Sequence, residues 1–302
     1  MKTIVTGGAG FIGSHVADAL SDAGHQVTVF DIKPSPYLRD DQQEVVGDLM
    51  DMDFMRSVVE GHQVVFHLAG IADIDECKVK PVDTVRINVL GTVQLLEVCK
   101  DLDIERFVFA SSAYVYSNSG FFYRSSKQAC ESFIENYADL YGLRYTSLRY
   151  GSLYGPRADM RNGIYRLVRQ AIETGRIEYT GTGKEQREFI HVLDAAQSSV
   201  KVLEPEFENT HITLTGKERM SFEDLLAMIK EMLGDQIEIS IKPGTRKAHY
   251  KITPYNFSPK MGRKLVNNPH VDMGQGLLQC LGELYEEIHQ EKENELGVLV
   301  NK

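Results

Sequence analysis

The first 31 residues constrain the fold of this chain more than any other stretch. Residues 2–6 are a short run rich in β-branched side chains, and residues 14–23 carry apolar side chains at helical spacing. Gly24 is placed to end that helix, and residues 26–30 form a second strand pattern that stops at Asp31. The stretch therefore predicts a strand, a helix and a second strand, which is the βαβ unit of a parallel sheet.

Glycines lie at the turn between the first strand and the helix. Gly7 allows a tight turn, Gly10 lets phosphates approach the backbone, and Gly13 lets helix and strand pack closely. The free N–H groups at the helix start favour an anion. Asp31 can accept hydrogen bonds from two ribose hydroxyls and would repel a 2′-phosphate. The unit predicts a bound dinucleotide, NAD rather than NADP; the plain alternative is a glycine turn that binds no nucleotide.

Strand and helix patterns alternate as far as Tyr150. Strands are expected at 44–49, 63–68, 106–110 and 144–149, and helices at 51–60, 83–100 and 123–140. This alternation predicts an α/β fold with a Rossmann-type doubly wound parallel sheet. Ligands of such sheets bind at the carboxyl ends of the strands. The residues expected at that edge are Thr6, Asp31, Asp48, Leu68 and Ser112.

Beyond Tyr150 the regular alternation stops. Helices are expected at 163–174, 221–233 and 276–290, strands at 188–190 and 236–241, and a frayed tail at 291–302. We therefore expect an NAD-binding domain at 1–150 and a smaller mixed α/β substrate lobe at 151–302. Segments near 184–203 are expected to pack back on the first domain.

Composition limits the partners. The net charge of −10 argues against nucleic acid or an anionic membrane surface as the main partner, and no apolar run approaches membrane-spanning length. The four cysteines (Cys77, Cys99, Cys130 and Cys280) form no Cys-x-x-Cys pair and have no histidine cluster nearby. They predict buried free thiols in a reducing cytoplasm and no metal site.

One tyrosine of the 14 has a lysine four residues later, and that pair is Tyr123 and Lys127. On a helix this spacing places both side chains on one face. A nearby ammonium favours the phenolate and lowers the phenol pKa, while Ser112 at a strand end could hold a substrate oxygen. The three residues predict removal of an alcohol proton while hydride leaves for the cofactor. Taken singly, each has a plain alternative as a helix-start pair or a strand-end cap.

Nine motifs occur in a family-specific order. They are Gly7–Gly13, Asp31, Gly47–Leu49, His67–Gly70, Asn88–Thr92, Ser111–Tyr116, Tyr123–Lys127, Leu148–Arg157 and Arg187–Asp194. Over about the first 200 residues the chain resembles the extended short-chain dehydrogenase/reductases of the sugar-nucleotide epimerase/dehydratase group. The resemblance implies NAD, a nucleoside-diphosphate sugar as substrate, and a homodimer formed through helices 83–100 and 123–140. Apolar surface for that dimer is expected from Val93, Leu96, Phe133 and Ile134.

The resemblance also assigns site residues. Ser112, Tyr123 and Lys127 are the expected catalytic residues. Cofactor contacts are expected from Gly7, Gly10, Phe11, Ile12, Gly13, Asp31, Ile32, Asp48, Leu49, Leu68, Ala69, Gly70, Asn88, Tyr123 and Lys127. Substrate contacts are expected from Ser112, Tyr150 and Arg187, with Arg187 on the diphosphate. The other arginines of the second lobe fit an anionic substrate; they are Arg157, Arg161, Arg166, Arg169 and Arg176. Of these, Arg166 and Arg169 are interpreted as a solvated helix face.

The chain departs from the family pattern at three places. Ala113 and Tyr114 stand where family dehydratases carry Asp-Glu and decarboxylases a Glu, which favours epimerisation or plain alcohol oxidation. The usual asparagine after the Arg-Tyr pair is replaced around Gly151 and Ser152, which removes an expected diphosphate contact. Only ten residues separate Ser112 from Tyr123, and this short segment predicts a more open site.

These observations favour a cytoplasmic NAD-dependent epimerase. It would act on a nucleoside-diphosphate sugar by transient oxidation to a keto-sugar, with Tyr123 as base. The alternatives are an NAD-linked dehydrogenase or keto-reductase, a dehydratase, and a non-catalytic nucleotide-sensing protein. The intact set of Ser112, Tyr123 and Lys127 argues against the sensor, which would have no need of it.

Overall fold

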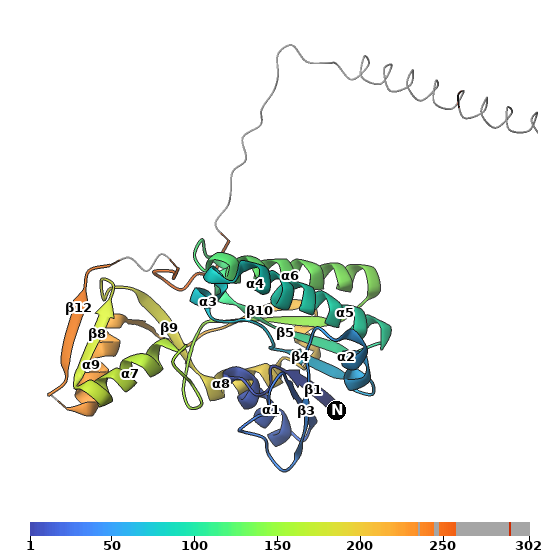
Figure 1. The fold of residues 1–302 in the computed structure, drawn as a ribbon, viewed down its shortest axis with the longest axis horizontal. Coiled ribbons are helices and arrows are strands. Elements are labelled where there is room, and N and C mark those ends of the chain that lie inside the picture. The colour runs from blue at the N-terminus through green and yellow to red at the C-terminus, as the bar shows by residue number, and fades with distance from the viewer. Residues whose placement is uncertain (235, 245–247, 258–289, 291–302) are drawn as a thin grey trace, which may run out of the picture. The chain divides into compact units, whose positions relative to one another are not determined.

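The computed structural model describes residues 1–234, 236–244, 248–257 and 290. The βαβ unit predicted at the amino terminus is present as β1 (Lys2–Thr6), α1 (Phe11–Asp22) and β2 (Gln26–Asp31). It belongs to a seven-stranded parallel sheet with the order β10-β6-β5-β4-β1-β2-β3 (Figure 1). The other strands are β3 (Gln42–Val46), β4 (Val64–His67), β5 (Arg106–Ser112), β6 (Tyr145–Tyr150) and β10 (Thr210–Leu214). The doubly wound parallel fold is therefore confirmed.

Helices cover both faces of this sheet (Figure 1). On one face lie α1 and α8 (Val192–Lys201), whose apolar side chains share a buried cluster with β1, β2 and β4. On the other face lie α2 (Met52–Val59), α5 (Gly91–Asp101) and α6 (Phe121–Tyr141). Because both faces are covered, the central strands are buried throughout, as expected of a parallel sheet. The carboxyl ends of the strands are left as the edge for ligands.

Two elements differ from the prediction. The third strand begins at Gln42 and ends at Val46, so Asp48 lies in the following turn, where its Oδ1 accepts a hydrogen bond from the Met50 N–H at 2.9 Å. The helix expected over 83–100 is divided into α4 (Pro81–Thr84), a π-helical turn (Val85–Leu90) and α5. Single π-helical turns are frequent at functional sites, and this turn carries Asn88. The short helix α3 (Ile74–Val79) precedes this run.

The part after β6 contains a third apolar cluster, formed around Ile177, Tyr179, Phe222 and Leu226. Its elements are β7 (Ser152–Tyr154), α7 (Gly163–Thr174), β8 (Arg176–Thr180), β9 (Gln186–His191), β11 (Arg219–Ser221), α9 (Phe222–Leu233) and β12 (Glu238–Lys242). Between them the chain returns to the first sheet, where α8 packs against α1 and β10 pairs with β6. The sequence patterns missed α3, α8, β7, β8, β10 and β11. The domain boundary at residue 150 stays a prediction.

The structure also shows the burial of residues expected at a dimer surface and of three cysteines. Leu96 and Ile134 are fully buried beside the sheet, so they are not dimer surface as expected, whereas Phe133 is 40% exposed. Cys77, Cys99 and Cys130 are buried free thiols. Three expectations concern residues that the structure does not describe, apart from residue 290. They are the helix at 276–290, Cys280 and the tail at 291–302. No helix in the described ranges is both long and apolar enough to cross a membrane.

Candidate active site

The glycine turn after β1 is built by close backbone contacts. Gly7 has φ +73°, and a Cβ there would lie 2.6 Å from the Ala69 nitrogen. A Cβ on Gly13 would lie 2.1 Å from the Gly7 carbonyl oxygen, which is too close for any side chain. The helix α1 begins after Gly10 with no side-chain cap, so its first N–H groups point into the turn. This turn has the form of an anion cradle.

Asp31 and the residues after β4 complete this end of the sheet. The Asp31 carboxylate accepts a hydrogen bond from the Ala9 N–H at 3.1 Å, which places it against the glycine turn at the end of β2. Leu68 and Ala69 lie beside Gly7, and Leu49 is buried in the same core cluster as Phe30. Ile32 is 71% exposed beside Asp31. These residues fit NAD: a cradle for the pyrophosphate and a carboxylate for a ribose.

The Asn88 side chain hydrogen-bonds to other parts of the protein. Its Oδ1 accepts a hydrogen bond from the Ile71 N–H at 2.7 Å. Its Nδ2 donates to the Ile71 carbonyl at 2.9 Å and to Ser126 Oγ at 3.1 Å. The side chain thus ties the loop after β4 to the first turns of α6. In this arrangement Asn88 positions neighbouring backbone, and it is not turned outward to receive a ligand.

The structure brings Ser112, Tyr123 and Lys127 together. Ser112 is the last residue of β5, and its hydroxyl lies close enough to the phenol of Tyr123, in the first turn of α6, to lower the pKa of that phenol. Lys127 lies one turn further along α6, with its ammonium 6.0 Å from the centre of the Tyr123 ring. It is buried, and it also lies 4.7 Å from the Phe109 ring. The helical i, i+4 spacing predicted this juxtaposition.

Burial governs the protonation of this group. Burial raises the pKa of Tyr123 to about 12, and the hydrogen bond from Ser112 opposes that rise. Burial also lowers the pKa of the Lys127 ammonium. Low polarity disfavours the charged form of each group, so a phenolate at neutral pH needs added positive charge close by. An oxidised nicotinamide ring beside Tyr123 is a source of such charge.

A buried ion pair that the sequence analysis missed supports the group. Glu131 on α6 receives two hydrogen bonds from Arg149 of β6, at 2.8 and 2.9 Å. The same carboxylate accepts the Ser111 hydroxyl at 2.5 Å. A sequence signal existed: Glu131 follows Lys127 by four residues, as Lys127 follows Tyr123, so all three lie on one face of α6. The pair fixes α6 against the ends of β5 and β6.

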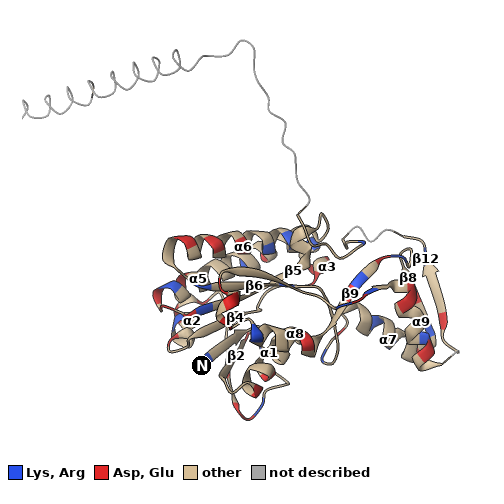
Figure 2. Ribbon diagram, turned by 180° about the vertical axis from the view of Figure 1, so that it is seen from behind, with Lys and Arg blue, Asp and Glu red and all other residues tan. Residues whose placement is uncertain are grey.

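A cavity of about 620 Å³ adjoins Tyr114 and continues between β7, α7, β8 and β9. Arg166 and Arg187 line it, and neither pairs with a carboxylate among the described residues. Arg187 is buried, with its guanidinium 4.3 Å from the Tyr250 ring centre. Basic residues are visible on both α7 and β9 (Figure 2). The cavity can therefore take an anionic ligand, and Arg166, expected on a solvated face, in fact belongs to its wall.

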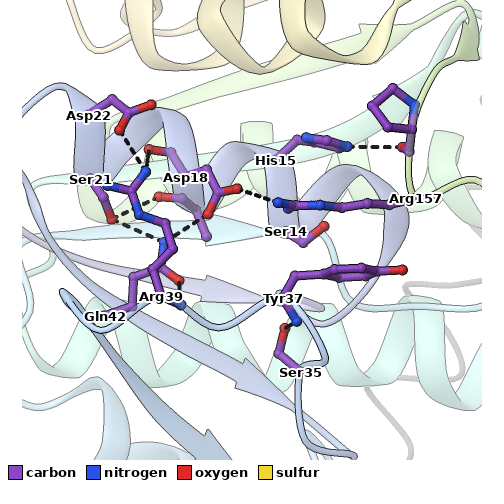
Figure 3. Close-up of polar contacts among 12 residues, drawn as sticks. Ser14, His15, Asp18, Ser21, Asp22, Ser35, Tyr37, Arg39, Gln42 and Arg157 are labelled. Carbon is purple, nitrogen blue, oxygen red and sulfur yellow. Dashed lines mark hydrogen bonds and ion pairs between the residues drawn. The ribbon is translucent and has the colours of Figure 1, made fainter.

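Other predicted substrate residues lie elsewhere. Arg157 pairs with Asp18 of α1 at 2.7 Å and stacks over the Tyr37 ring, so it braces the dinucleotide-binding helix (Figure 3). Tyr150 is buried, and its hydroxyl bonds with Ser199 of α8 at 2.6 Å. Alternation along β6 turns the Tyr150 side chain toward the helix layer, and its expected substrate contact stays a prediction.

Arg161 and Arg169 line the cavity but are paired with Asp159 and Glu173, respectively. Arg176 lies 3.7 Å from Glu178. Two histidines of the family motifs hydrogen-bond within the fold. His67 is held between Thr6 and Thr92, and burial lowers its pKa to about 3, whereas His191 caps α8.

The short segment between Ser112 and Tyr123 is covered from a distant part of the chain. The Gly120 N–H donates to the Ala248 carbonyl at 2.9 Å. Further along the same stretch, Tyr250 packs on Tyr114 with ring centroids 4.5 Å apart, and Phe257 packs on Tyr116. Residues more than a hundred positions away therefore occupy one side of this segment, and the more open site expected from its shortness stays a prediction.

Comparison with known proteins places the chain in a family. A model of the NAD dependent epimerase/dehydratase family matches residues 3–214. The chain is 30% identical to a provisionally named UDP-glucose 4-epimerase of Methanocaldococcus jannaschii, with 91% of this chain and 95% of that protein covered. It is 27% identical to a UDP-N-acetyl-alpha-D-glucosaminuronate decarboxylase of Bacillus cytotoxicus, with 93% and 96% covered.

Among solved structures, the UDP-glucose 4-epimerase of Thermotoga maritima with UDP-glucose matches with a TM-score of 0.77 and 26% identity. The match covers 85% of this chain and 90% of that one. The parallel fold, the glycine turn after β1 and the family match all indicate an NAD-binding protein. The chain belongs to the NAD dependent epimerase/dehydratase family, and its cofactor is NAD.

Proposed function

We propose that the protein is an epimerase of a nucleoside-diphosphate sugar, working by transient oxidation to a keto-sugar. The observation that carries the proposal is the grouping of Ser112, Tyr123 and Lys127 beside Tyr114, whose side chain lines the arginine-lined cavity. The nucleotide and diphosphate occupy the cavity, with Arg187 and Arg166 facing the phosphates. The sugar then lies at the Tyr114 end, beside Tyr123.

Each residue of the group has one task in this proposal. Ser112 hydrogen-bonds the reacting sugar oxygen and so aligns it with the Tyr123 phenol. Tyr123, as phenolate, takes the hydroxyl proton and later returns it to the same oxygen. Lys127 supplies positive charge that favours the phenolate. Bound NAD supplies the acceptor and donor of hydride.

The surroundings favour epimerisation over water loss. Loss of water needs an added acid and base, and the turn after Ser112 offers Ala113 and Tyr114. Glu131 is committed to Ser111 and Arg149. The cavity carboxylates Glu173 and Glu178 are held by Arg169 and Lys242. An NAD-linked dehydrogenase, which would release its reduced cofactor, remains the second candidate because it needs the same residues.

The test removes one hydroxyl. Tyr123→Phe should bind NAD and fold as the wild type does, yet lose about three orders of magnitude in turnover of the nucleotide sugar, because the proton acceptor is gone. Tyr137→Phe is the matched control on the same helix, since its hydroxyl bonds with Glu97 away from the cavity. Turnover of Tyr123→Phe at the control's rate would show that Tyr123 is not the base.

A further inference from the structure

The loop after β2 is in contact with a distant part of the chain. This loop, residues 32–41, leads from β2 to β3 and begins beside Asp31. In a dinucleotide-binding sheet the carboxylate at that position takes the ribose of the adenosine half. Within the loop, the half-buried ring of Tyr37 has its centre 4.6 Å from the guanidinium carbon of Arg157. Arg157 comes from the turn that follows β7.

Arg157 also reaches the helix that starts at the glycine turn. Its Nη2 donates to the Asp18 carboxylate of α1 at 2.7 Å, and both side chains are mostly buried. Figure 3 shows Arg157 extended alongside the Tyr37 ring with its tip at Asp18. A planar guanidinium can stack on a ring and pair with a carboxylate at the same time. Arg157 therefore holds the middle of the loop to α1, as the Arg39–Asp22 pair holds its end.

The turn that carries Arg157 is itself fixed in place. The Pro156 carbonyl accepts a hydrogen bond from His15 Nε2 of α1 at 3.0 Å. Gly155 has φ +137°, and a Cβ there would lie 2.8 Å from Val192 Cγ1 at the start of α8. Arg157 has φ +63°, a left-handed conformation that is unfavourable for a residue with a Cβ. Such strain persists where the surroundings fix it, and here it aims the arginine at the loop.

We propose that Arg157 and Tyr37 form a latch that retains the adenosine half of NAD. Arg157 is a positioning residue in this account: it holds the Tyr37 loop on α1, and the loop in turn keeps the backbone beside Asp31 against the ribose. The inference goes beyond the proposed function, because it concerns retention of the cofactor and needs no nucleotide sugar. A slow release of NAD suits an enzyme that reuses its cofactor in place.

The rate at which bound NAD leaves the holoenzyme tests the latch. Exchange of bound NAD for excess NADH, followed by NADH fluorescence, measures that rate. Arg157→Met removes the stack and the ion pair and should speed the release about tenfold. Tyr37→Leu should speed it similarly, whereas Tyr37→Phe keeps the ring and should stay within about twofold of the wild type. The two Tyr37 variants decide the matter even if Arg157→Met does not fold.

Arg144→Met is the matched control and should leave the release rate unchanged. Arg144 also pairs with a distant residue, Glu208 at 3.5 Å, but it precedes β6 at the amino end of the sheet, opposite the ligand edge. Unchanged release from Tyr37→Leu, or equal rates from Tyr37→Leu and Tyr37→Phe, would overturn the latch.

Separate halves of the cofactor distinguish a latch from a general effect on α1. ADP and nicotinamide mononucleotide are each measured by competition with NADH. Arg157→Met should weaken ADP about tenfold and leave nicotinamide mononucleotide within about twofold, because the latch acts on the adenosine half. Equal weakening of both halves would show that Arg157 merely supports the glycine turn and would reject the proposal.

Discussion

At the scale of single residues, the proposed reaction depends on lowering the pKa of Tyr123. Burial raises the pKa of Tyr123 to about 12, so the phenol by itself would be protonated at neutral pH. In the proposed function the Lys127 ammonium, 6.0 Å from the ring centre, favours the phenolate. The spacing predicted that Tyr123 and Lys127 lie together, because residues four apart share one face of a helix. It could not predict the contact of Arg157 with Tyr37, because no local pattern links residues so far apart.

Replacing Lys127 should move the pH dependence of turnover. In Lys127→Met the positive charge is lost, so the phenolate is less stable and the apparent pKa of the ascending limb rises. The ascending limb of the pH–rate profile should shift to higher pH by about one unit or more, with NAD still bound. The pH–rate profiles of wild type and variant measure this directly. An unmoved limb would mean that Lys127 does not act on the Tyr123 pKa.

At the scale of elements, one helix face organises the site. Tyr123, Lys127 and Glu131 follow at steps of four on α6 and meet the ends of β5 and β6. Periodicity predicted α2, α7 and α9 well because each has an amphipathic pattern and a side-chain cap. It missed the π-helical turn around Asn88. In that turn the Asn88 side chain makes tertiary hydrogen bonds with Ile71 and Ser126, which periodicity does not show. It could not predict that Tyr150 meets α8, because the sequence of a strand buried on both faces does not show which helix layer a side chain contacts.

The Glu131–Arg149 pair gives a stability prediction. Glu131→Ala leaves a buried guanidinium without its countercharge and should lower the free energy of unfolding by about 3–5 kcal/mol, measured by urea titration. The double variant Glu131→Met, Arg149→Met should recover much of that loss, because neither charge then remains buried. A single-variant loss below about 1 kcal/mol would show that the pair contributes little to holding α6.

At the scale of the whole molecule, apolar surface points to self-association. Exposed apolar side chains follow α4, the π-helical turn and α6; they are Val82, Val85, Leu90, Phe133 and Leu140. Covering such a surface is a common reason for a homodimer. We propose that these helices form the dimer contact. The sequence favours the same helices, and the dimer contact through them stays a prediction, but two of the residues expected there, Leu96 and Ile134, are buried against the sheet.

Sedimentation tests this contact. The wild type should sediment as a dimer at micromolar concentration, and Phe133→Asp should shift it toward monomer, because a charge would then be buried in the interface. Lys201→Asp is the control, since it changes charge on α8, on the opposite face of the sheet. A monomeric wild type, or a Phe133→Asp variant as dimeric as the control, would remove the proposal.

The fate of the hydride tests the central claim most directly. An epimerase returns the hydride to the sugar in each cycle, so NAD is regenerated in the site and Tyr123 recovers its starting protonation. With the nucleotide sugar that binds most tightly, we predict an epimeric product without net NADH and without stoichiometric added cofactor. Both products are followed together, the sugar by chromatography and NADH by absorbance. Steady NADH accumulation matched one-for-one by a keto-sugar would contradict the epimerase and establish the dehydrogenase.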